Sequence, residues 1–308
     1  MHRMRSALKV VLIVGLVLAT ASVAYAQKVL LRYHYKPGEK YTSVTTSDQS
    51  IEQQIANQNV RIKQSMRMEM AMEVKSVDAA GVAEVDITYS RVALKQDSPM
   101  ANIDYDSADA LKKDVDHPAL AGFKALVGKT LTVMLTRRGE VKSIKGLKEI
   151  AEEILNQVPA GPGREAARKQ LAVMFDEKNY GERLGGLAIV LPQDPVGVGD
   201  AWNKDQKIAM GFTNMVVKTT YTVKSVGETV EIDVNSTIEP GGEPDPGLGM
   251  TTTIEKGTQK GLTKMQKDNA ALMNGEIQQD LKMTINMRGR VIKQTLDAVT
   301  SFSTTRKQ

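Results

Sequence analysis

The stretch that decides the fold, residues 74–87, reads Val-Lys-Ser-Val-Asp-Ala-Ala-Gly-Val-Ala-Glu-Val-Asp-Ile. Its opening Val-Lys-Ser-Val recurs 149 positions later, at residues 223–226. Its closing Ala-Glu-Val-Asp-Ile corresponds to Val-Glu-Ile-Asp-Val at residues 230–234 of the second copy. Each copy alternates apolar and polar residues on both sides of a short turn, which is typical of an antiparallel hairpin. We therefore expect two copies of one β-rich unit.

Two further matches extend the repeat. Leu-Thr-Val-Met-Leu at residues 131–135 leads into Arg-Gly-Glu-Val, and Leu-Lys-Met-Thr-Ile at residues 281–285 leads into Arg-Gly-Arg-Val, 150 positions away. More weakly, Gly-Glu-Lys-Tyr at 38–41 pairs with Gly-Asp-Ala-Trp at 199–202, which are 161 positions apart. The larger spacing implies a longer opening hairpin in the first half. The common order and nearly constant spacing favour a duplication over chance.

Between the two halves the apolar period changes from two residues to that of a helix. Leu147, Ile150, Ile154 and Val158 form one helical stripe, and Pro-Ala-Gly-Pro-Gly at residues 159–163 ends it. A second helix is expected from near Arg164, and a short one from 118 to 127. The pattern predicts an α+β fold that is mainly antiparallel β. Its two duplicated halves, residues 27–146 and 188–308, would form a half-barrel or paired sheets, with a helical hairpin connector at 147–187 lying across a sheet.

Residues 1–26 have the pattern of a signal peptide. Arg3, Arg5 and Lys9 precede an apolar run at 10–19, and Ala-Tyr-Ala at 24–26 is a small-x-small cleavage sequence. The run is shorter than the roughly 20 residues of a spanning helix. We therefore expect cleavage before Gln27, a secreted or periplasmic protein and no membrane span after cleavage. The alternative is an uncleaved anchor.

The composition removes several function classes. The 308 residues include no cysteine, three histidines and one tryptophan. Disulfides, thiolate metal sites and a cysteine nucleophile are therefore excluded. Without the signal peptide, basic and acidic residues nearly balance, so we expect no nucleic-acid partner. Phosphate-binding glycine motifs, a nucleophile elbow and a zinc-type helix are all missing. We expect neither an enzyme nor a cofactor.

A family resemblance follows from several motifs. They are Pro-Gly-Glu-Lys-Tyr at 37–41, Tyr-Asp-Ser at 105–107, Leu-Val-Gly-Lys-Thr-Leu-Thr-Val at 126–133 and Arg-Gly-Glu-Val at 138–141. Together they resemble a bacterial secreted family known only as a domain of unknown function, which assigns no catalytic residues to this chain. More remotely, long antiparallel strands around helices are similar to lipid and lipoprotein carriers of the LolA/LppX type. That similarity is one of fold and implies little about function by itself.

Four methionines, Met66, Met68, Met70 and Met72, alternate along one predicted strand. On a strand their thioethers line one face at intervals of roughly 6.6–7 Å. They are our candidate ligand-binding residues, with three interpretations. Methionine fills irregular core space, it suits the wall of a cavity for ligands of variable shape, and thioethers bind Cu(I) in exported proteins. Core packing is the leading interpretation, which Met283 and Met287 on one face with Ile285 in the other half favour. The copper site ranks last, because no histidine or cysteine supplements it.

Other polar candidates have structural explanations. Asn102, Asp104, Asp106 and Asp109 form an acidic stretch that lacks the glycine and glutamate of a calcium loop, so Asx-turns are expected there. His34 and His117 have no neighbouring acid or nucleophile in the sequence, and we interpret both as non-catalytic. Carboxylates are plentiful, but no spacing marks a glycosidase pair.

These observations favour a non-enzymatic carrier or binding protein for an apolar ligand, such as a lipid or lipoprotein, in the periplasm or cell envelope. The alternative is an envelope structural or interaction module without a small-molecule site. A hydrolase that uses carboxylates ranks third. We expect a monomer whose partners are an apolar ligand or an envelope protein.

Overall fold

The computed structural model describes residues 28–55, 58–99, 101–117, 120–185, 189–209, 213–242, 250–287 and 289–307. The expected signal peptide, residues 1–26, lies outside the described residues. The strands of the first half are β1 (Lys40–Ile55), β2 (Gln58–Val77), β3 (Ala83–Asp97), β4 (Asn102–Asp106), β5 (Thr130–Leu135) and β6 (Val141–Lys145). Those of the second half are β7 (Ala201–Ala209), β8 (Asn214–Val226), β9 (Thr229–Pro240), β10 (Met250–Gln266), β11 (Met273–Met287) and β12 (Arg290–Arg306). Between them lie the helices α2 (Ala121–Leu126), α3 (Leu147–Asn156), α4 (Pro162–Met174) and α5 (Glu177–Gly185).

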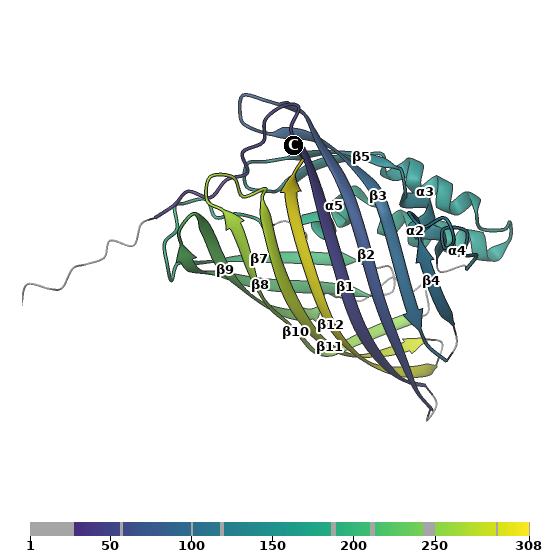
Figure 1. Ribbon diagram of the computed structural model, residues 1–308. Helices are drawn as coiled ribbons and strands as arrows, with labels where there is room; N and C mark the ends of the chain where they lie inside the picture. Colours follow the sequence, from purple (N-terminus) through teal and green to yellow (C-terminus); the bar gives the residue numbers. More distant parts are fainter. Residues whose placement is uncertain are drawn as a thin grey trace, which may run out of the picture.

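All twelve strands belong to one open antiparallel sheet (Figure 1). The strand order is β6-β5-β3-β2-β1-β12-β11-β10-β9-β8-β7, and β4 pairs with the far part of β3. The two halves meet where the first strand pairs with the last, over a register that runs from Tyr41↔Arg306 to Ile55↔Ile292. The expected mainly antiparallel α+β fold is confirmed, and its form is a half-barrel-like single sheet rather than paired sheets.

The opening strands of the two halves repeat the same hydrogen bonds. The N–H of Gly38 donates to the carbonyl of Val74 (2.8 Å), and the N–H of Val74 donates to the carbonyl of Glu39 (2.9 Å). Gly199, Val223 and Asp200 make the same two bonds, at 2.8 and 3.0 Å. Both glycines have a positive φ, and both copies contain a β-bulge directly after the valine. Thus β1-β2-β3 and β7-β8-β9 are structural counterparts.

The match between residues 131–135 and 281–285 does not extend this correspondence. Residues 131–135 form β5, which pairs with β3. Residues 281–285 lie in β11, whereas the strand that pairs with β9 is β10. The two segments therefore occupy different places in the sheet. They look alike because each precedes a tight turn that requires a left-handed glycine, Gly139 (φ +82) or Gly289 (φ +81).

The connector contains three helices rather than a simple hairpin. α3 starts at the predicted residue, and α4 begins at Pro162, two residues before Arg164, because proline fits the first turn of a helix. α3 and α4 pack mainly against each other and against α2 and α5. The helices that contact the sheet most are α2, on β3, and α5, which lies between the sheet's two edge strands β6 and β7.

Residues 28–37 close one end of the half-barrel, which we call the closed end. Val29 forms a bridge with Val196, and the N–H of Tyr33 donates to the carbonyl of Arg137 (2.8 Å). The buried Tyr33 hydroxyl donates to the carbonyl of Ile189 (2.9 Å). Burial raises the pKa of Tyr33 well above its ordinary value, so the hydroxyl stays protonated as a donor. The main core, with side chains from both halves, lies directly beneath this segment.

Gly139→Ala tests the docking of this segment. A Cβ at Gly139 would lie 2.6 Å from a ring carbon of Tyr33 and 3.1 Å from the Ile189 carbonyl oxygen. Gly289 has the same φ with nothing within 4 Å, so Gly289→Ala measures the backbone cost alone. We expect free energies of unfolding lower by about 3 kcal/mol or more for Gly139→Ala and about 1–2 kcal/mol for Gly289→Ala, measured in urea. Equal losses would contradict this account of the closed end.

Candidate ligand-binding interior

The register of the strands arranges the interior side chains in rows that cross the sheet. Alternate residues of β1 (Tyr41, Thr45, Gln49) point to the interior, and the residues directly opposite them on β2 and β12 do the same. From the closed end toward the opposite end of the strands, these rows change from apolar to polar and back to apolar. The candidate site is therefore a layered surface rather than a cluster of catalytic groups.

All four methionines of β2 lie on this interior face. Met72 and Met70 pair with Ile87 and Tyr89 of β3 and belong to or pack against the main core. Met66 and Met68 pack against a second cluster, formed by β3, β4 and the segment around α2. Only Met70, 4% exposed, is fully buried. The structure therefore brings the four together along one wall, and their role in binding a ligand stays a prediction.

A small cavity adjoins the methionine wall at the closed end. Its volume is about 80 Å³, and Tyr33, Tyr35, Met70, Met72 and Leu184 are among the residues that line it. Sites for small molecules commonly measure roughly 300–1,000 Å³. Burial raises the pKa of Tyr35, as it does for Tyr33. The closed end is thus mostly packed core, and a lipid chain would have to lie farther along the interior.

A polar row crosses nine strands in the middle of the interior. We call it the amide row, and each of its residues lies directly opposite the next in the sheet register. Its members, from β3 to β7, are Gln96, Gln64, Gln49, Ala298, Gln279, Gln259, Ser236, Thr219 and Lys204. The Gln259 amide donates to the Gln279 carbonyl oxygen (2.8 Å), and the Thr219 and Ser236 hydroxyls are 2.9 Å apart. Apart from Ala298, which has no polar side chain, and Lys204, which is charged, the members of this row offer neutral hydrogen-bonding groups to the interior.

An apolar row lies one interior position beyond the amide row. We call it the open-end row, and it consists of Ile62, Ile51, Leu296, Leu281, Ile238 and Val217. Gly257 lies between Leu281 and Ile238, where a Cβ would lie 2.5 Å from Ile238 and 3.1 Å from Leu281. Because Gly257 has no side chain, the side chains of Leu281 and Ile238 can approach each other. Ile62, Ile51 and Leu296 are partly exposed, whereas the other three are buried.

Sequence reasoning did not find these two rows. Every strand of the row except β12, which contributes Ala298, has a polar residue at this interior position, as Gln49 of β1 shows. That signal predicts an interior polar position in one strand. Alignment of these positions across nine strands depends on the register of every pairing, which a single sequence does not specify.

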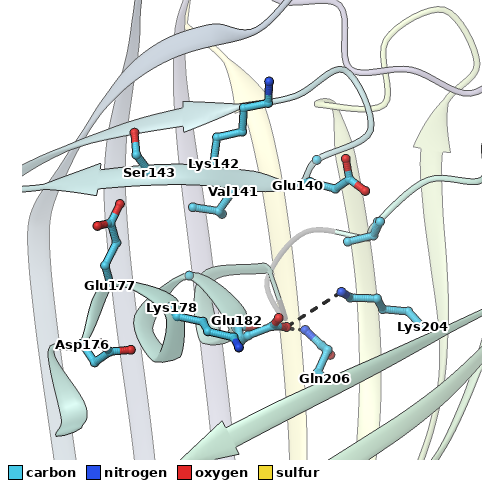
Figure 2. Close-up of a pocket in the computed structure, with 13 residues that line it drawn as sticks. Glu140, Val141, Lys142, Ser143, Asp176, Glu177, Lys178, Glu182, Lys204 and Gln206 are labelled. Atoms are coloured by element: carbon cyan, nitrogen blue, oxygen red, sulfur yellow. Dashed lines mark hydrogen bonds and ion pairs between the residues drawn. The ribbon is translucent and has the colours of Figure 1, made fainter.

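A pocket of about 460 Å³ lies at the seam between the two edge strands (Figure 2). α5 lies within this seam, and Figure 2 shows Glu177 pointing from the helix toward β6. The Glu177 carboxylate accepts a hydrogen bond from the backbone N–H of Ile144 (2.8 Å). On the other side, Gln206 and Lys204 of β7 contact the Glu182 carbonyl (3.1 Å) and carboxylate (3.9 Å). The helix thus takes the place of a missing strand and protects an exposed edge.

The other polar candidates take structural roles. The Asp106 and Asp109 carboxylates accept hydrogen bonds from the N–H groups of Ala108 and Leu111, which confirms the expected Asx-turns. Asp106 also pairs with Arg91, which lowers the pKa of this carboxyl. Across the described ranges, no group of three or more His, Asp or Glu residues could hold a metal ion. His34 is exposed, and its Nδ1 lies 2.7 Å from the Asp268 carbonyl oxygen.

Of the helices in the described parts of the chain, none combines the length and the apolar character that crossing a bilayer requires.

The chain belongs to the family of unknown function DUF6263, whose model matches residues 80–272, more than half of the sequence. The expected resemblance to a family of unknown function is thereby confirmed, whereas the likeness to LolA/LppX-type carriers stays a prediction. A comparison with the curated proteins found no match.

Several solved structures match this chain over most of its length. A lipovitellin structure on lipid–protein interactions matches 88% of this chain with 11% identity and a TM-score of 0.42, over 25% of the lipovitellin chain. OpdQ of Pseudomonas aeruginosa matches 87% of this chain and 99% of its own, with 7% identity and a TM-score of 0.23. An outer membrane channel from Pseudomonas putida F1 matches 88% and 97%, with 7% identity and a TM-score of 0.24. TM-scores this low do not indicate a shared function.

Met70→Asp tests the position of the methionine wall. Met70 is buried in the interior, whereas Ala71, the next residue of β2, points to the opposite face. We expect Met70→Asp to lower the free energy of unfolding by more than about 3 kcal/mol, because it buries an unpaired charge. The control Ala71→Asp should change it by about 1 kcal/mol or less. Chemical denaturation measures both, and a tolerated Met70→Asp would contradict the packed wall.

Proposed function

We propose that this protein is a non-enzymatic, exported binding protein that carries an apolar ligand such as a lipid chain. The observation that carries the proposal is the partly exposed apolar surface of the open-end row. Ile51, Ile62 and Leu296 lie side by side on β1, β2 and β12 and point to the interior. Apolar side chains that a fold leaves partly exposed on a concave surface are typical of ligand-binding sites.

The lack of a covering layer supports this proposal. Among the described residues, no helix makes an extensive contact with β1, β2, β11 or β12. Beyond the amide row, the interior face of these strands therefore contacts mainly side chains of other strands in the same curled sheet. Farther along the strands, Ile254 and, beyond the Gln53–Gln294 pair, Ile55 and Ile292 are also partly buried interior residues. An acyl chain lying along these residues would remove their remaining apolar surface from water, at roughly 25 cal/mol per Å².

The alternative is an envelope interaction module without a small-molecule site. The volume of about 80 Å³ at the closed end favours this alternative, because it is too small for a drug-sized or lipid ligand. The two candidates differ in the use of the open-end row. A carrier binds a free apolar molecule there, whereas a module of the second kind uses an outer surface and leaves the interior empty.

Ile62→Asn tests the carrier function. We expect the affinity for N-phenyl-1-naphthylamine, an uncharged apolar probe, to fall about five- to tenfold, because roughly 1 kcal/mol of apolar contact is lost. Lys63→Asn, at the next residue of the same strand on the opposite face, is the matched control and should leave the affinity unchanged. Fluorescence titration measures both.

The unmodified protein gives the direct test. Extraction of the protein purified from its exporting host should release an apolar compound that mass spectrometry detects. If nothing is released and the probe does not bind, the carrier function is wrong.

Export makes a separate prediction. The full-length chain expressed in a bacterium should be recovered outside the cytoplasm with its first 26 residues removed. Intact mass and N-terminal sequencing should then place Gln27 at the mature N-terminus. A full-length mass in the membrane fraction would instead identify an uncleaved anchor.

A further inference from the structure

Arg183 of α5 is a half-buried cation beside Tyr180, a residue of the main core. It follows Tyr180 by one helical turn, and its guanidinium lies over the Tyr180 ring, 5.0 Å from the centroid. One terminal nitrogen donates to the carbonyl of Met174 at the end of α4. Its Nε is buried and has no hydrogen-bond partner in the described part of the chain. Part of the hydrogen-bonding capacity of this guanidinium is therefore unused.

No carboxylate balances this charge within the described ranges. The ion pairs found there include none with Arg183. Its neighbour Glu182 points to the seam and pairs with Lys204. Burial lowers the pKa of the Arg183 guanidinium, which means that the folded protein disfavours the bare cation. A desolvated arginine without a counter-charge is costly, and such residues commonly mark sites for an anion.

Two tyrosine hydroxyls lie beside the guanidinium. The Tyr89 and Tyr180 oxygens are 2.7 Å apart and both side chains are buried. Burial raises the pKa of both phenols, so each keeps its proton. Only one of the two protons lies in the bond between them, and the second is available to another acceptor. Arg183 and this pair thus form a cluster of donors.

This donor cluster adjoins the methionine wall. Tyr89 lies directly opposite Met70 in the sheet, and Leu184, the residue after Arg183, lines the small cavity together with Met70 and Met72. The cation therefore lies one residue from the lining of a mainly apolar cavity. An oxyanion that reached Arg183 would be held in a low-dielectric environment, where charge-assisted hydrogen bonds are strongest.

We propose that Arg183 is an anion-binding residue that holds the carboxylate or phosphate group of an amphiphilic ligand, with help from the Tyr89–Tyr180 pair. The inference rests on the proposed carrier function and narrows its ligand to acidic amphiphiles. The planar guanidinium matches a carboxylate or phosphate in a paired geometry.

A purely structural explanation gives opposite expectations. If Arg183 only caps the end of α4 through the Met174 carbonyl, its replacement should destabilise the fold and affect every ligand equally. If it binds an anion, its replacement removes an unbalanced charge. The protein should then keep its melting temperature or gain a few degrees, and it should lose affinity only for acidic ligands.

The test compares oleate with oleyl alcohol, which differ only in the charged group. In displacement of N-phenyl-1-naphthylamine, we expect the full-length mature protein to bind oleate at least tenfold more tightly than oleyl alcohol. Arg183→Gln should reduce this preference to less than twofold, with unchanged binding of the uncharged probe. Arg168→Gln, which removes an exposed arginine of α4, is the matched control and should keep the preference. Dioleoyl phosphatidate and inorganic phosphate, tested separately, distinguish a lipid headgroup from a free anion.

The outcomes separate this inference from the proposed function. If the uncharged probe binds but oleate and oleyl alcohol bind equally, the anion site is wrong and the carrier function stands. An unchanged oleate preference in Arg183→Gln, or a lower melting temperature with equal loss of both ligands, also overturns it. If no probe binds at all, the carrier function itself fails. Should Arg183→Gln not fold, Arg183→Lys replaces it, with an expected preference reduced at least threefold, and an unchanged preference overturns the site.

Discussion

The antiparallel pairing of β1 with β12 is the interaction on which the rest of the structure depends. It joins strands from opposite ends of the described chain, over a register from Tyr41↔Arg306 to Ile55↔Ile292. Side chains reinforce it on the interior face, where the Ser47 and Thr300 hydroxyls meet at 3.0 Å and the Gln53 amide donates to Gln294. Without this pairing the two halves would be separate sheets with two more exposed edges. With it, they share one interior.

A sheet that curls this far without closing leaves two edge strands whose backbone groups need hydrogen-bond partners. β6 and β7 are those edges, and α5 lies between them with Glu177 accepting a hydrogen bond from the β6 backbone. The segment before β1 closes one end through Tyr33. Both devices satisfy backbone groups that would otherwise attract another strand. They also explain why the closed end is packed and why an apolar chain would have to use the opposite part of the interior.

The layering of the interior connects this architecture to the proposed function. Apolar residues at the closed end contribute to stability, because most of them are buried between the sheet, the helices and residues 28–37. The amide row and the half-exposed open-end residues contribute less burial, so stability alone does not account for them. Arg183 also works against stability, because a half-buried cation without a counter-charge opposes folding. Residues that a fold retains against its own stability are candidates for function.

The sequence by itself determined the local structure. Alternation predicted the strands, the change of period predicted α3 and α4, and the glycines at 38 and 199 marked equivalent turns, because strand and helix periodicity and left-handed turns are properties of neighbouring residues. The four methionines were likewise placed on one face. Only the tertiary structure decided which strands pair, that α5 fills the seam, and that the positions of the amide row share one interior. Register and long-range proximity depend on contacts between residues far apart in the sequence, such as Tyr41 and Arg306, which are 265 positions apart, and no local pattern encodes them. For the same reason the match between residues 131–141 and 281–291 did not correspond to equivalent strands, because similar turn chemistry recurs wherever a hairpin needs it.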